Sequence, residues 1–109
     1  MNAEALAAAE AAVARGGDAD DILRGVVEGL FDRGIGYAAV RFVEGGHLVD
    51  GPSAGVGEAA ATADVVFDGQ IVGELALSAD DPQLAARIAE LIAPYVLVGW
   101  DTGGEAWEP

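Results

Sequence analysis

Apolar and polar positions follow a helical period in the first and last parts of the chain and the period of a strand in the middle. Residues 2–15 are rich in alanine, the residue with the strongest intrinsic preference for helix. Between Ile22 and Leu30 the apolar residues fall on one helical face, and Asp18 is placed to cap the start of that helix. From Tyr37 the apolar residues tend to recur at every second position, which predicts strands with two different faces.

Glycine-containing turns divide the middle of the chain into two predicted hairpins. Gly45–Gly46 and Asp68–Gly69 are turn signals that join antiparallel strands. The glycine- and alanine-rich segment 51–61 is predicted to be a loop between the hairpins. The four predicted strands are 37–44, 47–50, 62–67 and 70–78.

A last helix is predicted from Asp80-Asp81-Pro82 onward, because proline is tolerated in the first helical turn. Pro94 is expected to kink this helix. Its apolar stripe consists of Leu84, Ile88, Leu91, Ile92 and Tyr95.

The order helix, hairpin, hairpin, helix predicts an α+β fold. We expect an antiparallel sheet of four or more strands, with the N- and C-terminal helices packed on one face. The predicted organisation is an N-terminal helix (1–17), a compact domain (18–98) and a tail (99–109) that holds two tryptophans. Because solvated tails rarely carry two large apolar side chains, we expect this tail to pack on the domain or on a partner.

Strand alternation assigns a face to each residue of the first and fourth strands. The residues expected to face the helices are Ala38, Val40, Phe42, Ile71, Leu75 and Leu77. The residues expected on the opposite face are Tyr37, Ala39, Arg41, Val43, Val72, Glu74, Ala76 and Ser78. If these two strands are neighbours, Arg41 and Glu74 are expected to form an ion pair.

Charge and composition exclude several classes of function. The 109-residue chain holds five arginines, no lysine and nineteen acidic residues, for a net charge of −14. Nucleic acid and anionic membranes require clustered cations, so neither is an expected partner. The absence of cysteine excludes disulfides and thiolate chemistry. No signal peptide or membrane span is indicated, and we expect a cytoplasmic protein.

Two short motif matches do not carry catalytic chemistry. Gly51–Gly55 fits the G-x-S-x-G pattern, but that motif needs a histidine later in the chain, and the only histidine, His47, precedes it. Residues 55–60 fit G-x-G-x-x-A, but no β-α-β unit surrounds them. A lone histidine also makes a poor metal site. We therefore expect no catalytic residue, no metal and no cofactor.

Three segments resemble a GAF domain: GYAAVRF at 36–42, LVDGP at 48–52 and GQIVGEL at 69–75. The resemblance covers about Ile22 to Tyr95. Within the family, the chain is similar to the free methionine-R-sulfoxide reductases. That branch implies a thiol enzyme, which this chain without cysteine cannot be. Its acidic pair would fall on Ala76 and Ser78, whereas its aromatic pocket residue would fall on Tyr37.

The function expected from these features is a non-catalytic, GAF-like sensory or protein-interaction module. We expect a homodimer, assembled through the first and last helices as in many GAF proteins. The alternatives are a small-molecule-binding domain or a degenerate relative of the sulfoxide reductases. Arg41 offers a fork for a carboxylate and Tyr37 a stacking face. The candidate ligand-binding residues are Tyr37, Arg41, Glu74, Ser78, Trp100 and Trp107.

Overall fold

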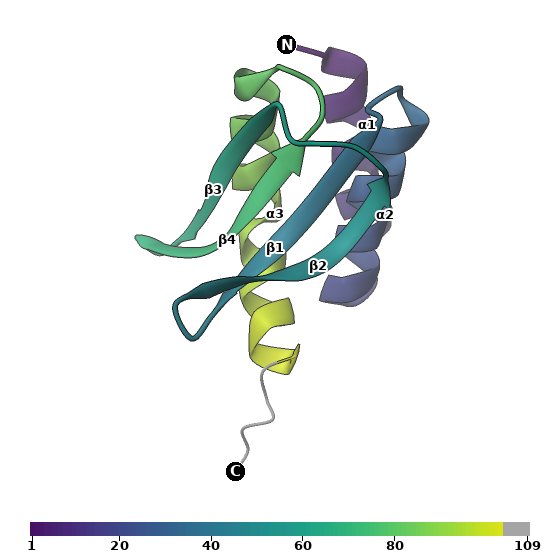
Figure 1. Cartoon of the computed structure of the whole chain (residues 1–109). Coiled ribbons are helices and arrows are strands. Elements are labelled where there is room, and N and C mark those ends of the chain that lie inside the picture. The colour runs from purple at the N-terminus through teal and green to yellow at the C-terminus, as the bar shows by residue number, and fades with distance from the viewer. Residues whose placement is uncertain (104–109) are drawn as a thin grey trace.

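Three helices lie on one side of a four-stranded antiparallel sheet (Figure 1). The computed structural model describes the chain from Met1 to Gly103, with side chains described through Val96. The elements are α1 (Ala3–Arg15), α2 (Ala19–Asp32), β1 (Tyr37–Glu44), β2 (His47–Gly55), β3 (Ala61–Phe67), β4 (Gln70–Leu77) and α3 (Pro82–Gly103). The predicted α+β class is confirmed, with the helices from both ends of the sequence packed on the sheet.

The sheet joins two hairpins through their inner strands. Its order is β2-β1-β4-β3, so β1 and β4 are neighbours and β2 and β3 form the two edges. Asp68 and Gly69 both have positive φ, at 54° and 78°, as a tight two-residue hairpin turn requires. Any site on the sheet is therefore built around the central pairing of β1 with β4.

Side-chain caps fix the starts of the helices. Asp18 accepts a hydrogen bond from the backbone N–H of Asp21 at 2.9 Å, as the sequence predicts. One oxygen of Asp81 accepts from the N–H of Leu84 at 3.1 Å, at the start of α3. The other oxygen accepts from the N–H of Asn2 at 2.9 Å, so Asp81 also ties the start of α1 to the start of α3.

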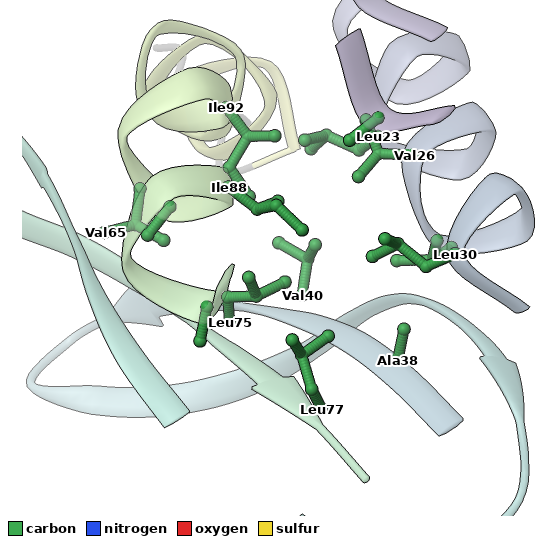
Figure 2. Close-up of a cluster of buried hydrophobic side chains, with 14 of the residues drawn as sticks. Leu23, Val26, Leu30, Ala38, Val40, Val65, Leu75, Leu77, Ile88 and Ile92 are labelled. Atoms are coloured by element: carbon green, nitrogen blue, oxygen red, sulfur yellow. The ribbon is translucent and has the colours of Figure 1, made fainter. Parts of the chain in front are cut away.

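The core lies between the sheet and the pair α2 and α3 (Figure 2). Each element contributes the apolar face that its period produces, and the fully buried residues include Leu23, Val26, Leu30, Val40, Val65, Leu75, Leu77, Ile88 and Ile92. α1 lies against α2 and α3 and buries Ala5, Ala9 and Ala12. Gly25 permits the close contact of α1 with α2, because a Cβ there would lie 3.2 Å from the Cβ of Ala12.

The second strand is longer than the sequence predicts. β2 continues through residues 51–55, which were expected to be loop, after a β-bulge. Ala39 pairs with Ser53 but Arg41 pairs with Asp50, so Gly51 and Pro52 together oppose Val40. A side chain on Gly51 would strike the Phe42 ring, and Pro52 is tolerated because β2 is an edge strand. Gly51–Gly55 is thus a strand segment, not a nucleophile turn.

A second bulge reverses the faces predicted for two residues of β4. The register shifts between Val65 and Val66, and Val66 pairs with Ile71. Ile71 is 52% exposed and lies opposite the helices, whereas Val72 is 7% exposed and belongs to the core. The expectation that Ile71 faces the helices and Val72 the other side is therefore wrong, because simple alternation does not hold across a bulge.

The last helix is also longer than expected. α3 continues through Pro94 and ends at Gly103, so residues 99–103 are helical and Trp100 stands in the final turns of α3. Trp107 lies outside the described residues.

Close packing of α3 on the sheet leads to a first prediction, at Gly73. A Cβ on Gly73 would strike the carbonyl oxygen of Arg41 and lie 2.9 Å from Cγ1 of Val96. We expect Gly73→Ala to lower the free energy of unfolding by about 1–3 kcal/mol, the usual cost of overpacking. Urea denaturation measures it, with Gly36→Ala as control, because a Cβ there meets Ser78 Oγ at an ordinary 3.6 Å. Equal stability of the two variants would contradict this packing.

The contact between helix starts leads to a second prediction, at Asp81. The hydrogen bond from Leu84, with a smaller contribution from Asn2, holds the pKa of Asp81 below its ordinary value. A lowered folded-state pKa means that ionised Asp81 stabilises the fold above its unfolded pKa and that this stabilisation is lost as the pH falls through the folded pKa.

We therefore expect Asp81→Asn to be less stable than the wild type at neutral pH, with the difference kept down to about pH 4 and lost only as the pH falls further, through the lowered folded-state pKa. Denaturation across this pH range is the measurement. Asp80→Asn is the control, since Asp80 takes part in none of these helix contacts among the described residues. A difference for Asp81→Asn that does not change with pH would refute the role of the charge.

Candidate functional site

The candidate site is the outer face of the sheet, the surface turned away from the helices. The crossing loop, residues 56–60, joins β2 to β3 across one end of this face (Figure 1). Three rows of side chains run across the strands, named in the order β2, β1, β4, β3. The small row is Ser53, Ala39, Ala76 and Thr62; the charged row is Asp50, Arg41, Glu74 and Asp64; the apolar row is Leu48, Val43, Ile71 and Val66.

An ion pair lies at the centre of the charged row. Nη1 of Arg41 donates to Oε1 of Glu74 at 2.7 Å, which confirms the predicted pair. Both side chains are mostly covered, with exposures of 28% and 22%. Nε of Arg41 lies 3.9 Å from Oδ1 of Asp50. Arg41 thus already faces two carboxylates of its own sheet. Fewer of its guanidinium N–H groups are left to bind the carboxylate of a ligand.

The bond to Glu74 also affects the protonation of Arg41. This hydrogen bond is the largest cause that raises the pKa of Arg41 above its ordinary value, and desolvation by burial opposes it. The guanidinium therefore stays charged at every physiological pH, and Arg41 cannot act as a proton donor or acceptor.

Tyr37 and Ser78 lie at the end of the outer face beneath the crossing loop. The N–H of Tyr37 donates to Oγ of Ser78 at 3.0 Å. A side chain on Gly57 would begin 3.4 Å from Cβ of Tyr37 and 4.0 Å from Cβ of Ser78, so the loop passes directly over both. The face that Tyr37 was expected to offer to a ligand is therefore partly covered by the chain itself.

The structure brings four of the six predicted ligand-binding residues together on two neighbouring strands. Tyr37 and Arg41 lie on β1, and Glu74 lies beside Arg41 on β4, with Ser78 just after β4. Their use by a ligand stays a prediction. The other two, Trp100 and Trp107, cannot be placed at this face, because neither side chain belongs to the described part of the molecule.

Sequence reasoning missed three of the four residues of the apolar row. It placed Ile71 on the helix face, and it left Leu48 and Val66 without a face. The bulge at Val72 is the cause for Ile71, and the sequence signal that could have revealed it is Gly73, since a glycine inside a strand often marks a bulge. The row is notable because Leu48, Ile71 and Val66 are all about half-exposed.

In the described part of the chain, the helix side includes two hollows. One is a shallow groove of about 450 Å³ between α1 and α2, and the other has a volume of about 200 Å³ between α1 and α3. The first is lined by Ala8, Ala11, Arg15, Gly25, Glu28, Gly29, Asp32 and Arg33. The second is lined by Leu6, Glu10, Arg87, Glu90 and Leu91. Both are open depressions with charged side chains at their edges, and these residues do not indicate any particular reaction.

Two structural findings concern the described residues only. Among the described side chains, residues 1–96, no three acidic or histidine side chains gather closely enough to hold a metal ion. The described helices, through Gly103, are too short or too polar to cross a membrane.

Comparison with protein-family models, with curated proteins and with solved structures finds no match to this chain. The resemblance to GAF domains therefore rests on the three sequence segments alone and stays a prediction.

The burial of the central ion pair leads to a third prediction. In a double-mutant cycle of Arg41→Leu and Glu74→Gln, we expect a coupling energy of about 1 kcal/mol, the upper end of the range for surface pairs. The control is Arg24 with Asp20 on α2, which has the same kind of contact at 2.8 Å but is largely exposed. For that helical pair we expect a clearly smaller coupling energy, because solvent screens two largely exposed charges. Denaturant unfolding of all variants gives both values, and a coupling at Arg41 no larger than at Arg24 would contradict the partial burial of the first pair.

Proposed function

We propose that this chain is a non-catalytic protein-interaction module that works as a homodimer. The sequence resemblance to GAF domains supports a sensory setting for it. A chain without cysteine also suits the reducing cytoplasm, where we propose that it acts.

The observation that carries the proposal is the distribution of exposed apolar side chains. In the described part of the chain, the exposed large apolar residues are Met1, Phe31, Leu48, Val56, Val66 and Ile71. Three of them form most of the apolar row, and Val56, which is 90% exposed, lies in the crossing loop at the other end of the same face. Apolar residues concentrated on one surface are typical of an interaction site.

The polar groups of the outer face support binding of a protein more than chemistry on a small molecule. Arg41 is engaged by Glu74 and approached by Asp50, and the hydroxyl of Ser78 already accepts a hydrogen bond from Tyr37. A small-molecule site needs a concave pocket with convergent polar groups. The outer face instead offers rows of side chains across a sheet, which suit a broad partner surface.

The proposal leads to a fourth prediction, on the purified wild-type protein. Sedimentation equilibrium up to high micromolar concentration is expected to show a reversible dimer, and native mass spectrometry is expected to show no retained small molecule. Incubation with free methionine sulfoxide and a thiol reductant is expected to give no turnover.

A monomer at every concentration would contradict the homodimer. A co-purified metabolite, or a thermal shift with a metabolite panel, would favour the alternative of a small-molecule-binding domain. Turnover of the sulfoxide would overturn the non-catalytic assignment.

A further inference from the structure

The two edges of the sheet differ in how open they are to another strand. β2, one edge, carries Pro52, which has no N–H to donate, and a bulge that sets Gly51 and Pro52 opposite Val40. Both features are typical of edges that are protected against pairing. β3, the other edge, holds neither proline nor glycine in its seven residues, and among the described strands its only neighbour is β4 (Figure 1). One side of β3 therefore presents backbone N–H and C=O groups that no described strand pairs.

The outer face becomes more negative toward the β3 edge. In the charged row, Arg41 donates to Glu74 and approaches Asp50, so both of these carboxylates have a cation nearby. Asp64 on β3 is exposed and has no ion-pair partner among the described residues. Its neighbour across the strands is Glu74, and like charges directly opposite each other are unfavourable. A cation beside Asp64, one strand further out, would continue the alternation of charge along the row.

We propose that the free edge of β3 binds an extended basic segment of a partner protein, which adds to the sheet as a fifth strand. Backbone hydrogen bonds provide the affinity in such an addition, and alternate side chains provide the specificity. This inference rests on the proposed role as an interaction module, and it names a class of partner for that module besides the second copy.

The outward side chains of β3 specify the sequence of this segment. An added strand that is antiparallel, like every other pair in this sheet, meets Val66 first, then Asp64 and then Thr62. An apolar residue of the segment covers Val66, which is half-exposed. Arginine or lysine two positions later pairs with Asp64, and a small polar residue two positions further on lies beside Thr62. The segment therefore reads apolar, basic and small polar at alternate positions.

A second copy of this chain does not fit the β3 edge. Its own edge strands carry Asp50 on β2 and Asp64 on β3, both in the charged row. With the rows aligned, either edge of a second copy would bring another aspartate beside Asp64. The net charge of −14 attracts a cationic partner instead. Charge complementarity at this edge therefore selects a basic segment of another protein.

The fifth prediction concerns the peptides that the wild-type protein selects from a displayed library of short random linear peptides. We expect enrichment of peptides with apolar, basic and small polar residues at alternate positions. The most enriched peptide, synthesised with capped termini, is expected to slow hydrogen exchange of β3 backbone amides and to leave the β2 amides unchanged, as NMR measures. A library that yields no peptide, or peptides without the basic position, would overturn the inference. Protection at β2 instead of β3 would overturn it as well.

Charge reversal at the two ends of the charged row provides a matched comparison. Asp64→Arg is expected to weaken binding of the synthetic peptide at least about tenfold, because an attraction becomes a repulsion. The new guanidinium would face Glu74, so we expect this variant to fold, and circular dichroism checks it. Asp50→Arg makes the same change on β2, about 19 Å from the added strand, which is beyond the screening length of about 8 Å. We expect it to leave binding within about twofold of the wild type.

A charge swap in the peptide separates direct contact from an indirect effect on the fold. The same peptide with glutamate in place of its basic residue is expected to bind Asp64→Arg more tightly than it binds the wild type. Weaker binding of both peptides to Asp64→Arg would mean that the substitution acts through the fold, and would overturn the contact. Equal weakening of the basic peptide by Asp50→Arg and Asp64→Arg would mean that only overall charge matters, and would overturn the edge site.

The oligomeric state keeps this inference distinguishable from the proposed homodimer. A wild-type dimer that selects no such peptide overturns the β3 site while the homodimer stands. A wild-type monomer that selects the expected peptides supports the β3 site and contradicts the homodimer alone. A monomer that selects none overturns both.

Discussion

Close packing of α3 against the sheet is the interaction on which the rest of the fold depends. Val96 lies over Gly73, and the stripe that includes Ile88 and Ile92 fills the space between the sheet and α2 (Figure 2). Apolar burial of this extent is the main source of stability in a domain of this size. Because α2 packs on the sheet beside α3, and α1 packs on both of these helices, all of the helical cover lies on one side.

Because the helices cover only one face of the sheet, the other face is turned toward solvent or toward a partner. An antiparallel sheet can leave one face to solvent, and such a face is normally polar. Here the central pair Arg41 and Glu74 meets that expectation, but Leu48, Ile71 and Val66 do not. The two bulges contribute to this, since one turns Ile71 outward and the other lets Gly51 and Pro52 continue β2 as an edge strand. Irregularities in the backbone, more than composition, make the outer face a candidate interface.

Much of the fold could be predicted from the sequence, because its helices and hairpin turns have strong local signals. Asp18 caps α2 as expected, and Asp68–Gly69 forms the predicted turn. The pairing of Arg41 with Glu74 was expected on the condition that β1 and β4 are neighbours, as a GAF-like strand order implies, and the structure has this pairing. The cap and the turn depend on neighbours in sequence, which a single sequence records.

The features that the sequence did not reveal depend on register between strands. Residues 51–55 contain glycine and proline and therefore resemble a loop, yet they pair with β1 because the bulge opposite Val40 accommodates them. Ile71 and Val72 exchange faces for the same kind of reason. The candidate residues Tyr37, Arg41 and Glu74 do lie on two neighbouring strands, whereas the three exposed residues of the apolar row, Leu48, Ile71 and Val66, were all missed.

The proposed homodimer places the outer face of the sheet, and not the helices, against a second copy. Methyl chemical shifts in NMR spectra recorded over a range of protein concentrations test it most directly. Concentration-dependent shifts are expected for the methyl groups of Leu48, Val56 and Ile71, and none for Leu6 and Leu91 on the helix side. Shifts confined to Leu6 and Leu91, or constant shifts at all five residues, would contradict it.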